Sequence, residues 1–186
     1  MHFLRILRNY IPHKLINYCF HLPLAILAVI FYGYPAGRLK VIGVTGTDGK
    51  TTTSTLIYEI LREAGKKAAL ITSVCEKINN ENIDTGFHVT TPDSWQLQKL
   101  LRKIVNKKIE YLVLESTSHG LSQFRLFGCN FKVGVITNVT HEHLDYHQNW
   151  SAYLKAKTML FKNTHTSILN IDDKSYNFLK KNAAGR

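Results

Sequence analysis

From Val41 onward, short apolar runs alternate with longer segments in which apolar residues recur at helical spacing. Short β-rich runs bounded by polar or glycine-rich segments are typical of buried strands, and apolar residues at i, i+3 and i+4 predict amphipathic helices. Strands that alternate with helices predict an α/β domain with a mostly parallel sheet flanked by helices on both faces. We expect strands at 40–45, 68–72, 111–115, 133–137 and 167–170, and helices at 51–64, 94–105 and 150–161.

The helix expected at 51–64 has the clearest apolar face, formed by Leu56, Ile57, Ile60 and Leu61, and Gly65 ends it. In sheets of this kind, ligands bind at the carboxyl ends of the strands. The residues that can carry chemistry should therefore be sought where the predicted strands end.

The first forty residues differ from the rest of the chain because they contain no Asp or Glu. Their most apolar run, Leu22–Phe31, has about ten residues, whereas a membrane-spanning helix needs about 20. We expect residues 1–39 to form a basic and apolar helical appendage, packed on the domain behind it, with a linker at 32–37. A signal peptide and a peripheral helix that contacts a membrane surface stay open as alternatives. The cations of this segment are Arg5, Arg8, Lys14, Arg38 and Lys40.

The composition fits one globular domain with such an appendage, because the 186 residues are 45% hydrophobic and 20% charged. The net charge of +11 suggests anionic partners. Nucleic acid is disfavoured as a partner, since the charge is diffuse and no recognition helix or aromatic RNA-binding signature is present. Three widely spaced cysteines without a Cys-x-x-Cys pair disfavour a disulfide scaffold and favour a reducing, cytoplasmic compartment.

A glycine-rich segment at 46–51, Gly-Thr-Asp-Gly-Lys-Thr, follows the first predicted strand and opens a helix. Its glycines allow a tight turn whose N–H groups can contact a phosphate, and the helix N-terminus favours negative charge. Lys50 can reach the β- and γ-phosphates, and the Thr51 hydroxyl can ligate Mg²⁺. The usual pattern has another glycine where Val44 stands, so the segment is a shortened variant. It predicts a nucleotide-binding loop, the alternative being a glycine-rich turn that binds nothing.

Two further polar segments follow predicted strands. Glu115 ends one strand, level with the glycine-rich loop, where its carboxylate can hold Mg²⁺ directly or through water. The segment 141–147, after the strand that leads to Asn138, contains three histidines and two acids. It has neither the cysteine partners of zinc deaminases nor the His-Glu-x-x-His spacing of zinc proteases, so Mg²⁺ is favoured over zinc.

Together these motifs resemble the central ATPase domain of the Mur ligases of peptidoglycan synthesis, and among them most closely the UDP-N-acetylmuramoyl-tripeptide synthetases. Six segments match in order and spacing, over about residues 40–175. The Ser-His-Gly-Leu and His-Leu-Asp-Tyr-His pieces favour the tripeptide synthetases over folylpolyglutamate and cyanophycin synthetases. The segments are 44–52, 90–93, 115–125, 137–147, 153–161 and 170–173.

The resemblance implies a P-loop NTPase-like fold over residues 40–186, with ATP and Mg²⁺ as cofactors. It implies that Lys50, His143 and Lys157 are catalytic, Lys157 being carbamylated by CO₂ and so becoming an anionic metal ligand. The implied metal ligands are Thr51, Glu115, His143 and Lys157. The implied nucleotide contacts are Gly46, Thr47, Asp48, Gly49, Lys50, Thr51, Thr52, Asn138, Asn170 and Asp173. The implied substrate contacts are Thr90, Thr91, Ser118 and Arg125.

The implied reaction is an ATP-dependent amide ligation. ATP phosphorylates the terminal carboxylate of a UDP-N-acetylmuramoyl-peptide, and the amine of an amino acid then attacks the acyl phosphate, giving an amide, ADP and phosphate. We expect the chain to lack the family's uridine-binding and C-terminal domains, to end before the central domain does, and to need a separate C-terminal ligase domain. The alternative is a catalytically incomplete nucleotide-binding or scaffold module derived from a Mur ligase.

Two residues depart from the family pattern. Asp48 stands where the loop usually has Asn, and its negative charge should weaken nucleotide binding unless it points away from the phosphates or meets Mg²⁺. Glu142 replaces the usual Asp before His143, which is a milder change.

Overall fold

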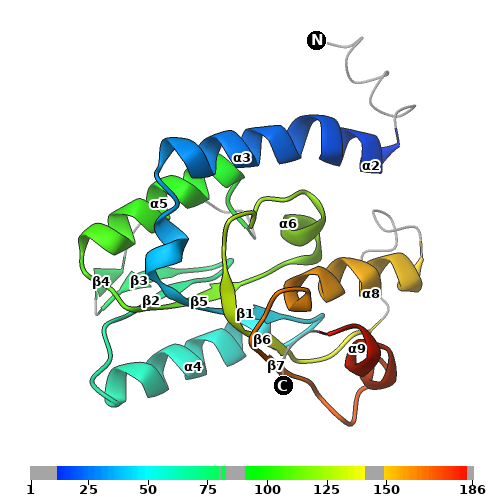
Figure 1. Ribbon diagram of the computed structural model, residues 1–186. Coiled ribbons are helices and arrows are strands. Elements are labelled where there is room, and N and C mark those ends of the chain that lie inside the picture. The colour runs from blue at the N-terminus through cyan, green and yellow to red at the C-terminus, as the bar shows by residue number, and fades with distance from the viewer. Residues whose placement is uncertain (1–11, 80, 83–90, 141–148, 184–186) are drawn as a thin grey trace.

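The computed structural model describes residues 12–79, 81–82, 91–140 and 149–183. Its centre is a seven-stranded sheet in the order β4-β3-β2-β5-β1-β6-β7 (Figure 1). The five strands from β2 to β7 in this order run parallel, whereas β3 and β4 are added antiparallel at one edge. The strands are β1 (Lys40–Thr45), β2 (Ala68–Ile71), β3 (Glu76–Ile78), β4 (Glu81–Asn82), β5 (Tyr111–Glu115), β6 (Phe131–Ile136) and β7 (Thr166–Ile168).

Helices cover both faces of this sheet, which confirms the α/β class. Figure 1 shows α4 on one face and α5, α6 and α8 on the other. The antiparallel β3 and β4, and the short helices α6 and α9, were not among the expected elements. The helices are α2 (His13–Ile16), η1 (Asn17–His21), α3 (Leu22–Phe31), η2 (Pro35–Arg38), α4 (Lys50–Glu63), α5 (Ser94–Asn106), α6 (Ser118–Ser122), α8 (Trp150–Thr158), η3 (Met159–Phe161) and α9 (Tyr176–Asn182).

The central strands are buried on both sides, because successive side chains point to opposite faces of a sheet. In β5, Leu112 and Leu114 belong to the larger core beneath α5, α6 and α8, and Val113 belongs to the smaller core beneath α4. Val41 and Val44 of β1 are divided in the same way. This double burial explains why these strands are continuous apolar runs in the sequence.

The apolar face expected for α4 is only partly correct. Leu56 and Ile60 are 59% and 67% exposed, and the fully buried residues of the helix are Ser54 and Tyr58. Tyr58 fixes this orientation, because its hydroxyl donates a hydrogen bond to the carbonyl of Asn79 beside β3. A tertiary contact therefore overrides the rotation that apolar spacing favours.

The N-terminal helix is longer than its most apolar run suggests. It extends without interruption over His13–Phe31, 19 residues with a mean hydropathy of 1.7, and is long and apolar enough by those measures to cross a membrane. The expectation that this segment is too short was therefore wrong. Such a helix near a chain start is weak evidence for a membrane span, since signal sequences share its composition.

Part of the expected packing of this helix is present. Ala25 and Ala28 are fully buried against the domain, and α3 packs beside α5. The segment expected to be a linker is a short 3-10 turn, η2, in which Pro35 and Ala36 are buried. The division of the chain into 1–39 and 40–186 stays a prediction.

Cysteine reactivity tests the burial of Cys129 in the domain and the exposure of Cys19 on the N-terminal helix. Burial raises the pKa of the Cys129 thiol to about 12, whereas Cys19 on the N-terminal helix is exposed. At about pH 8, roughly one Cys129 thiol in ten thousand would be ionised, and only the thiolate reacts with iodoacetamide. We therefore expect peptide mass spectrometry to find Cys19 alkylated and Cys129 unmodified in the native protein. Cys129 should react once urea unfolds the chain, and equal labelling of both cysteines before unfolding would contradict the prediction.

Candidate functional site

The glycine-rich loop lies at the carboxyl end of β1, in the middle of the parallel strands. β5 and β6 are the two neighbours of β1, paired with it over Val44↔Glu115 and Val44↔Val135. The residues that follow β5 and β6 must therefore flank the loop. This topology brings together three of the segments on which the sequence resemblance depends.

Two glycines of the loop are required by its geometry. Gly46 has a φ of 148°, and a Cβ atom there would lie 1.8 Å from the hydroxyl oxygen of Thr137. Gly49 has a φ of 73° and is the residue that precedes α4. The loop can approach the end of β6 and turn into α4 only because these residues lack side chains.

The segment after β6 holds the loop by hydrogen bonds. The Thr47 amide donates to the Asn138 carbonyl at 2.9 Å, and the Asp48 amide donates to Asn138 Oδ1 at 2.9 Å. The Thr137 hydroxyl donates to the Asp48 carbonyl at 2.6 Å. Asn138, a predicted nucleotide contact, thus braces the loop. Asp48 is exposed, and these bonds engage its main chain rather than its carboxylate.

Two lysines from distant parts of the chain meet at this loop. Lys50 Nζ donates to the Thr47 carbonyl and Lys157 Nζ to the Gly46 carbonyl, each at 2.5 Å. Lys157 is 1% exposed, and its ammonium lies 4.3 Å from the centre of the Tyr153 ring. A buried cation requires such partners, because its desolvation is costly. The structure therefore brings these two predicted catalytic residues to one place.

Glu115 and Thr51 form the oxygen-rich part of the site. Glu115 is 2% exposed, and the Thr51 hydroxyl donates to its Oε2 at 2.9 Å. The amide of Ser73 donates to the same oxygen at 3.3 Å. Hydroxyl and carboxylate oxygens are the donors that Mg²⁺ prefers, and Mg²⁺ commonly takes one or two carboxylates and keeps several waters. These residues therefore fit a magnesium ion.

The other predicted metal ligands are not joined to this pair. His143 lies outside the described residues, and Lys157 contacts the Gly46 carbonyl. Within the part of the chain that the structure describes, no three His, Cys, Asp or Glu side chains gather as a metal cluster. The complete metal set stays a prediction.

Three residues at the site were not among the predicted site residues. Ser73 lies two residues after β2, the neighbour of β5, and its position just beyond a buried strand is the signal that could have found it. Thr137 begins the segment that holds the loop. The hydroxyl of Tyr153 lies 3.2 Å from Thr47 Oγ1. Thr137 directly follows β6 and has the same signal, whereas the contact of Tyr153 is tertiary and has no signal in local sequence.

A second cluster lies beside Glu115, where α6 begins. Thr91 is 1% exposed and its hydroxyl lies 2.8 Å from that of Thr117, which caps α6. Arg125 Nη1 donates to the Thr91 carbonyl at 2.7 Å. Ser118, the first residue of α6, is also buried. Three predicted substrate contacts are thus gathered together, and the fourth, Thr90, lies outside the described residues.

The last two predicted nucleotide contacts brace the segment that holds the loop. Asn170 Nδ2 donates to the Thr137 carbonyl at 2.8 Å, and the Val139 amide donates to Asp173 Oδ2 at 3.1 Å. Burial raises the pKa of Asp173, but hydrogen bonds from the Ser175 hydroxyl and amide and from Val139 outweigh it, so the pKa lies below its ordinary value. Thr52, the remaining nucleotide contact, is exposed in the first turn of α4.

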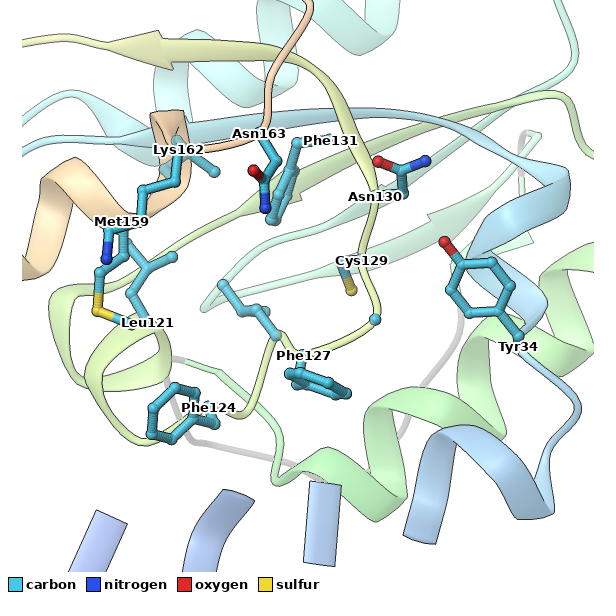
Figure 2. Close-up of a pocket in the computed structure, with 13 residues that line it drawn as sticks. Tyr34, Leu121, Phe124, Phe127, Cys129, Asn130, Phe131, Met159, Lys162 and Asn163 are labelled. Carbon is cyan, nitrogen blue, oxygen red and sulfur yellow. The ribbon is translucent and has the colours of Figure 1, made fainter. Parts of the chain in front are cut away.

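A cavity of about 510 Å³ lies apart from these residues (Figure 2). It is near the start of β6, whereas the loop is at the other end of the strands. Its walls are mainly apolar, with Phe124, Phe127 and Phe131 among them, and none of the predicted site residues lines it. The cavity is therefore separate from the predicted nucleotide site.

The family model described as the Mur ligase middle domain matches residues 44–186. The chain belongs to the Mur ligase family. UDP-N-acetylmuramoyl-L-alanyl-D-glutamate–2,6-diaminopimelate ligases of Clostridium botulinum and Bacteroides fragilis are 41% and 43% identical to it, over 87% and 80% of this chain. The chain spans about a third of the length of these curated relatives, 33% and 31%.

Solved structures agree with this membership of the Mur ligases. One of a UDP-N-acetylmuramoyl-L-alanyl-D-glutamate–2,6-diaminopimelate ligase superposes with a TM-score of 0.71 at 34% identity, covering 78% of this chain and 29% of that one. A Mycobacterium tuberculosis folylpolyglutamate synthase complexed with ADP gives a TM-score of 0.70 at 13% identity, covering 86% and 42%. The second likeness concerns the fold alone. The diaminopimelate ligases support the expected closeness to tripeptide synthetases.

Asp173 provides a test of the bracing described above. Because its folded-state pKa is depressed, its stabilising contribution is complete above the unfolded value of about 3.9 and is lost as the pH falls through the folded value. We expect Asp173→Asn to lower the free energy of unfolding by about 1 kcal/mol at neutral pH, and by less in acid. Urea unfolding at several pH values measures this, with the exposed neighbour Asp172→Asn as control. A loss that is the same at every pH would contradict it.

Proposed function

We propose that this chain is the nucleotide-binding part of an ATP-dependent Mur-type ligase, which adds an amino acid to a UDP-N-acetylmuramoyl-peptide. The observation that carries the proposal is the meeting of Lys50, Thr51 and Glu115 at a glycine-rich loop, in a chain of this family. The relatives' names specify L-alanyl-D-glutamate as the peptide and 2,6-diaminopimelate as the amino acid. We propose the same peptide class for this chain, and a cytoplasmic location.

The loop and Lys50 would bind the phosphates. The amides at the start of α4 and the positive end of the helix favour a phosphate group, as at other helix N-termini. The Lys50 ammonium lies over the loop, on the Thr47 carbonyl, and its flexible side chain can exchange that contact for a phosphate oxygen. Positive charge beside the transferred phosphoryl group stabilises the transition state of phosphoryl transfer.

Thr51 and Glu115 would hold the magnesium ion. When bound, Mg²⁺ neutralises phosphate charge and aligns the transferred group. Glu115 is oriented before any ion arrives, because Thr51 and Ser73 both donate to its Oε2. Lys157 positions the loop through the Gly46 carbonyl, and its carbamylation stays a prediction from the resemblance.

The cluster of Thr91, Ser118 and Arg125 would bind the peptide substrate beside the phosphates. Arg125 can pair with a carboxylate, which is the chemistry of the peptide's terminus. The terminal carboxylate attacks the γ-phosphorus, so that an acyl phosphate forms and ADP leaves. The amine of the amino acid then forms the C–N bond, and phosphate and a proton leave. A separate C-terminal ligase domain stays part of this proposal.

The alternative is a nucleotide-binding or scaffold module without ligase activity. The names of the relatives favour the ligase. Ligation by the chain in the presence of a separately expressed C-terminal Mur ligase domain would count for the ligase. Nucleotide binding without ligation under those conditions would count for the module.

Removal of the Lys50 ammonium tests the phosphate site. We expect Lys50→Ala to weaken binding of Mg-ATP and Mg-ADP at least ten-fold, about 1.4 kcal/mol, in calorimetric titration. Lys66→Ala is the matched control, because it removes the same charge from an exposed position beyond the other end of α4. Unchanged affinity in Lys50→Ala would refute the assigned role, and no binding by the parent chain would favour the scaffold module.

Removal of the Glu115 charge tests the metal site separately. We expect Glu115→Gln to reduce the gain in ATP affinity that Mg²⁺ produces, because a neutral amide is a poorer magnesium ligand. In EDTA the variant should bind ATP at least as well as the parent, since a negative charge near the phosphates is gone. Glu110→Gln, at an exposed position before β5, is the control. An unaltered response to Mg²⁺ would remove Glu115 from the site.

A further inference from the structure

From Leu15 to Phe31, the exposed face of the N-terminal helix His13–Phe31 has no charged or amide side chain, and the exposed His13 and Lys14 lie in the first turn before it. Leu27, Ile30 and Phe31 are 56%, 69% and 71% exposed. This face is continuous over five turns of helix, all within the described residues, and only 17% of the apolar window is buried. Its exposed residues are Leu15, Tyr18, Cys19, Phe20, Pro23, Leu24, Ile26, Leu27, Ile30 and Phe31.

The inner face of the same helix is docked along its length on the domain. Ala25 and Ala28 are fully buried, and Val29 packs so closely on Gly128 that a Cβ there would lie 2.6 Å from Val29 Cγ2. Near the other end, Asn17 is buried, and Tyr18 at the border of the two faces has its ring 5.1 Å from that of Phe124. Figure 1 shows the helix lying along the layer formed by α5 and α6. Only the outer face is therefore available to a partner.

The outer face of such a helix needs apolar material packed against it. A helix that is apolar all round is stable where apolar surroundings enclose it, in a protein core or in lipid. Monomeric soluble proteins rarely expose contiguous apolar surfaces of this extent. The outer face offers a protein partner hardly any hydrogen-bonding groups, although protein interfaces typically contain many. These properties favour hydrocarbon as the covering material.

The surroundings of this face are basic. Trp95 of α5 is 42% exposed and its ring lies 5.1 Å from that of Phe31, so it extends the apolar surface. Lys99 and Lys103 are exposed at i+4 and i+8 from Trp95, on the same side of α5. Residues 1–40 and 94–109 contain no Asp or Glu. Asp93, the acid nearest to Trp95 in sequence, caps α5 by accepting from the Gln96 amide.

We propose that the outer face of His13–Phe31, together with Trp95, lies in the surface of an anionic lipid bilayer, with the helix parallel to the membrane. Basic residues beside an apolar helix match anionic headgroups, and tryptophan favours the boundary between lipid and water. The docked inner face keeps the helix in this plane. α4 lies on the opposite face of the sheet, so the helix that follows the phosphate loop stays in water (Figure 1).

Sedimentation with vesicles tests this proposal on the whole chain. We expect binding to vesicles of phosphatidylglycerol and phosphatidylcholine in equal parts, much weaker binding to phosphatidylcholine alone, and loss of binding as salt is raised. Leu27→Glu with Ile30→Glu should weaken binding at least ten-fold. Lys99→Gln with Lys103→Gln should weaken it several-fold and leave the apolar face intact.

The chain contains a matched control for the first variant. Leu56 and Ile60 of α4 are 59% and 67% exposed, close to the 56% and 69% of Leu27 and Ile30. Leu56→Glu with Ile60→Glu adds the same charge on the opposite face of the sheet and should bind vesicles like the parent. Circular dichroism of each variant verifies the fold, which exposed substitutions should preserve.

Several outcomes would overturn the proposal. The first is no binding of the parent chain to anionic vesicles. The second is an equal loss of vesicle binding in the two pairs of glutamate substitutions. The third is a dimer, seen by light scattering, that dissociates in Leu27→Glu with Ile30→Glu, which would assign the face to a second copy of the chain. Bound protein should be released by alkaline carbonate. Retention after that treatment would indicate a helix that spans the membrane rather than one lying along it.

Discussion

The conformation of the glycine-rich loop before Lys50 depends on hydrogen bonds and close packing with the segment that follows β6. Thr137 and Asn138 supply one hydroxyl, one amide oxygen and one carbonyl to the backbone of residues 47–48. Thr137 also occupies the space that any side chain at position 46 would need. That segment is itself held by Asn170 and Asp173. The proposed binding of phosphate by backbone amides therefore depends on contacts that extend to the strand at the far edge of the sheet.

This bracing determines how charge is arranged at the site. Lys50 and Lys157 each donate to a loop carbonyl, so positive charge is fixed beside the loop. On the other side of β1, the buried Glu115 carboxylate is held by Thr51 and Ser73. Cations from α4 and α8 and a carboxylate at the end of β5 suit a bound phosphate and its metal ion, because each finds the opposite charge in place. The contacts of Asp48 are made by its main chain, and its side chain is exposed.

The strands and the site motifs could be predicted from sequence because each has a local signal. β5 (Tyr111–Glu115) was predicted to the residue, since its apolar run is bounded by polar residues. The face of α4 could not be predicted, because Tyr58 reaches a carbonyl in a distant loop. The contacts of Asn138 and Asp173 could not be predicted either. The family resemblance implied that both residues contact the nucleotide, but their hydrogen bonds within the loop network are properties of the fold.

Exposed apolar residues have different meanings on α4 and on the N-terminal helix. Leu56 and Ile60 stand beside Thr52, Glu59 and Glu63, so water reaches polar groups throughout that face, and such scattered residues are ordinary on protein surfaces. On the N-terminal helix the exposed positions from Leu15 to Phe31 follow one another without a charged side chain. The exposed fractions of individual apolar residues are similar in the two helices, but only on the N-terminal helix do these residues form a continuous apolar surface. Scattered apolar residues leave polar groups between them for water to solvate, whereas a continuous apolar surface does not. A continuous apolar surface of this kind therefore needs an apolar partner.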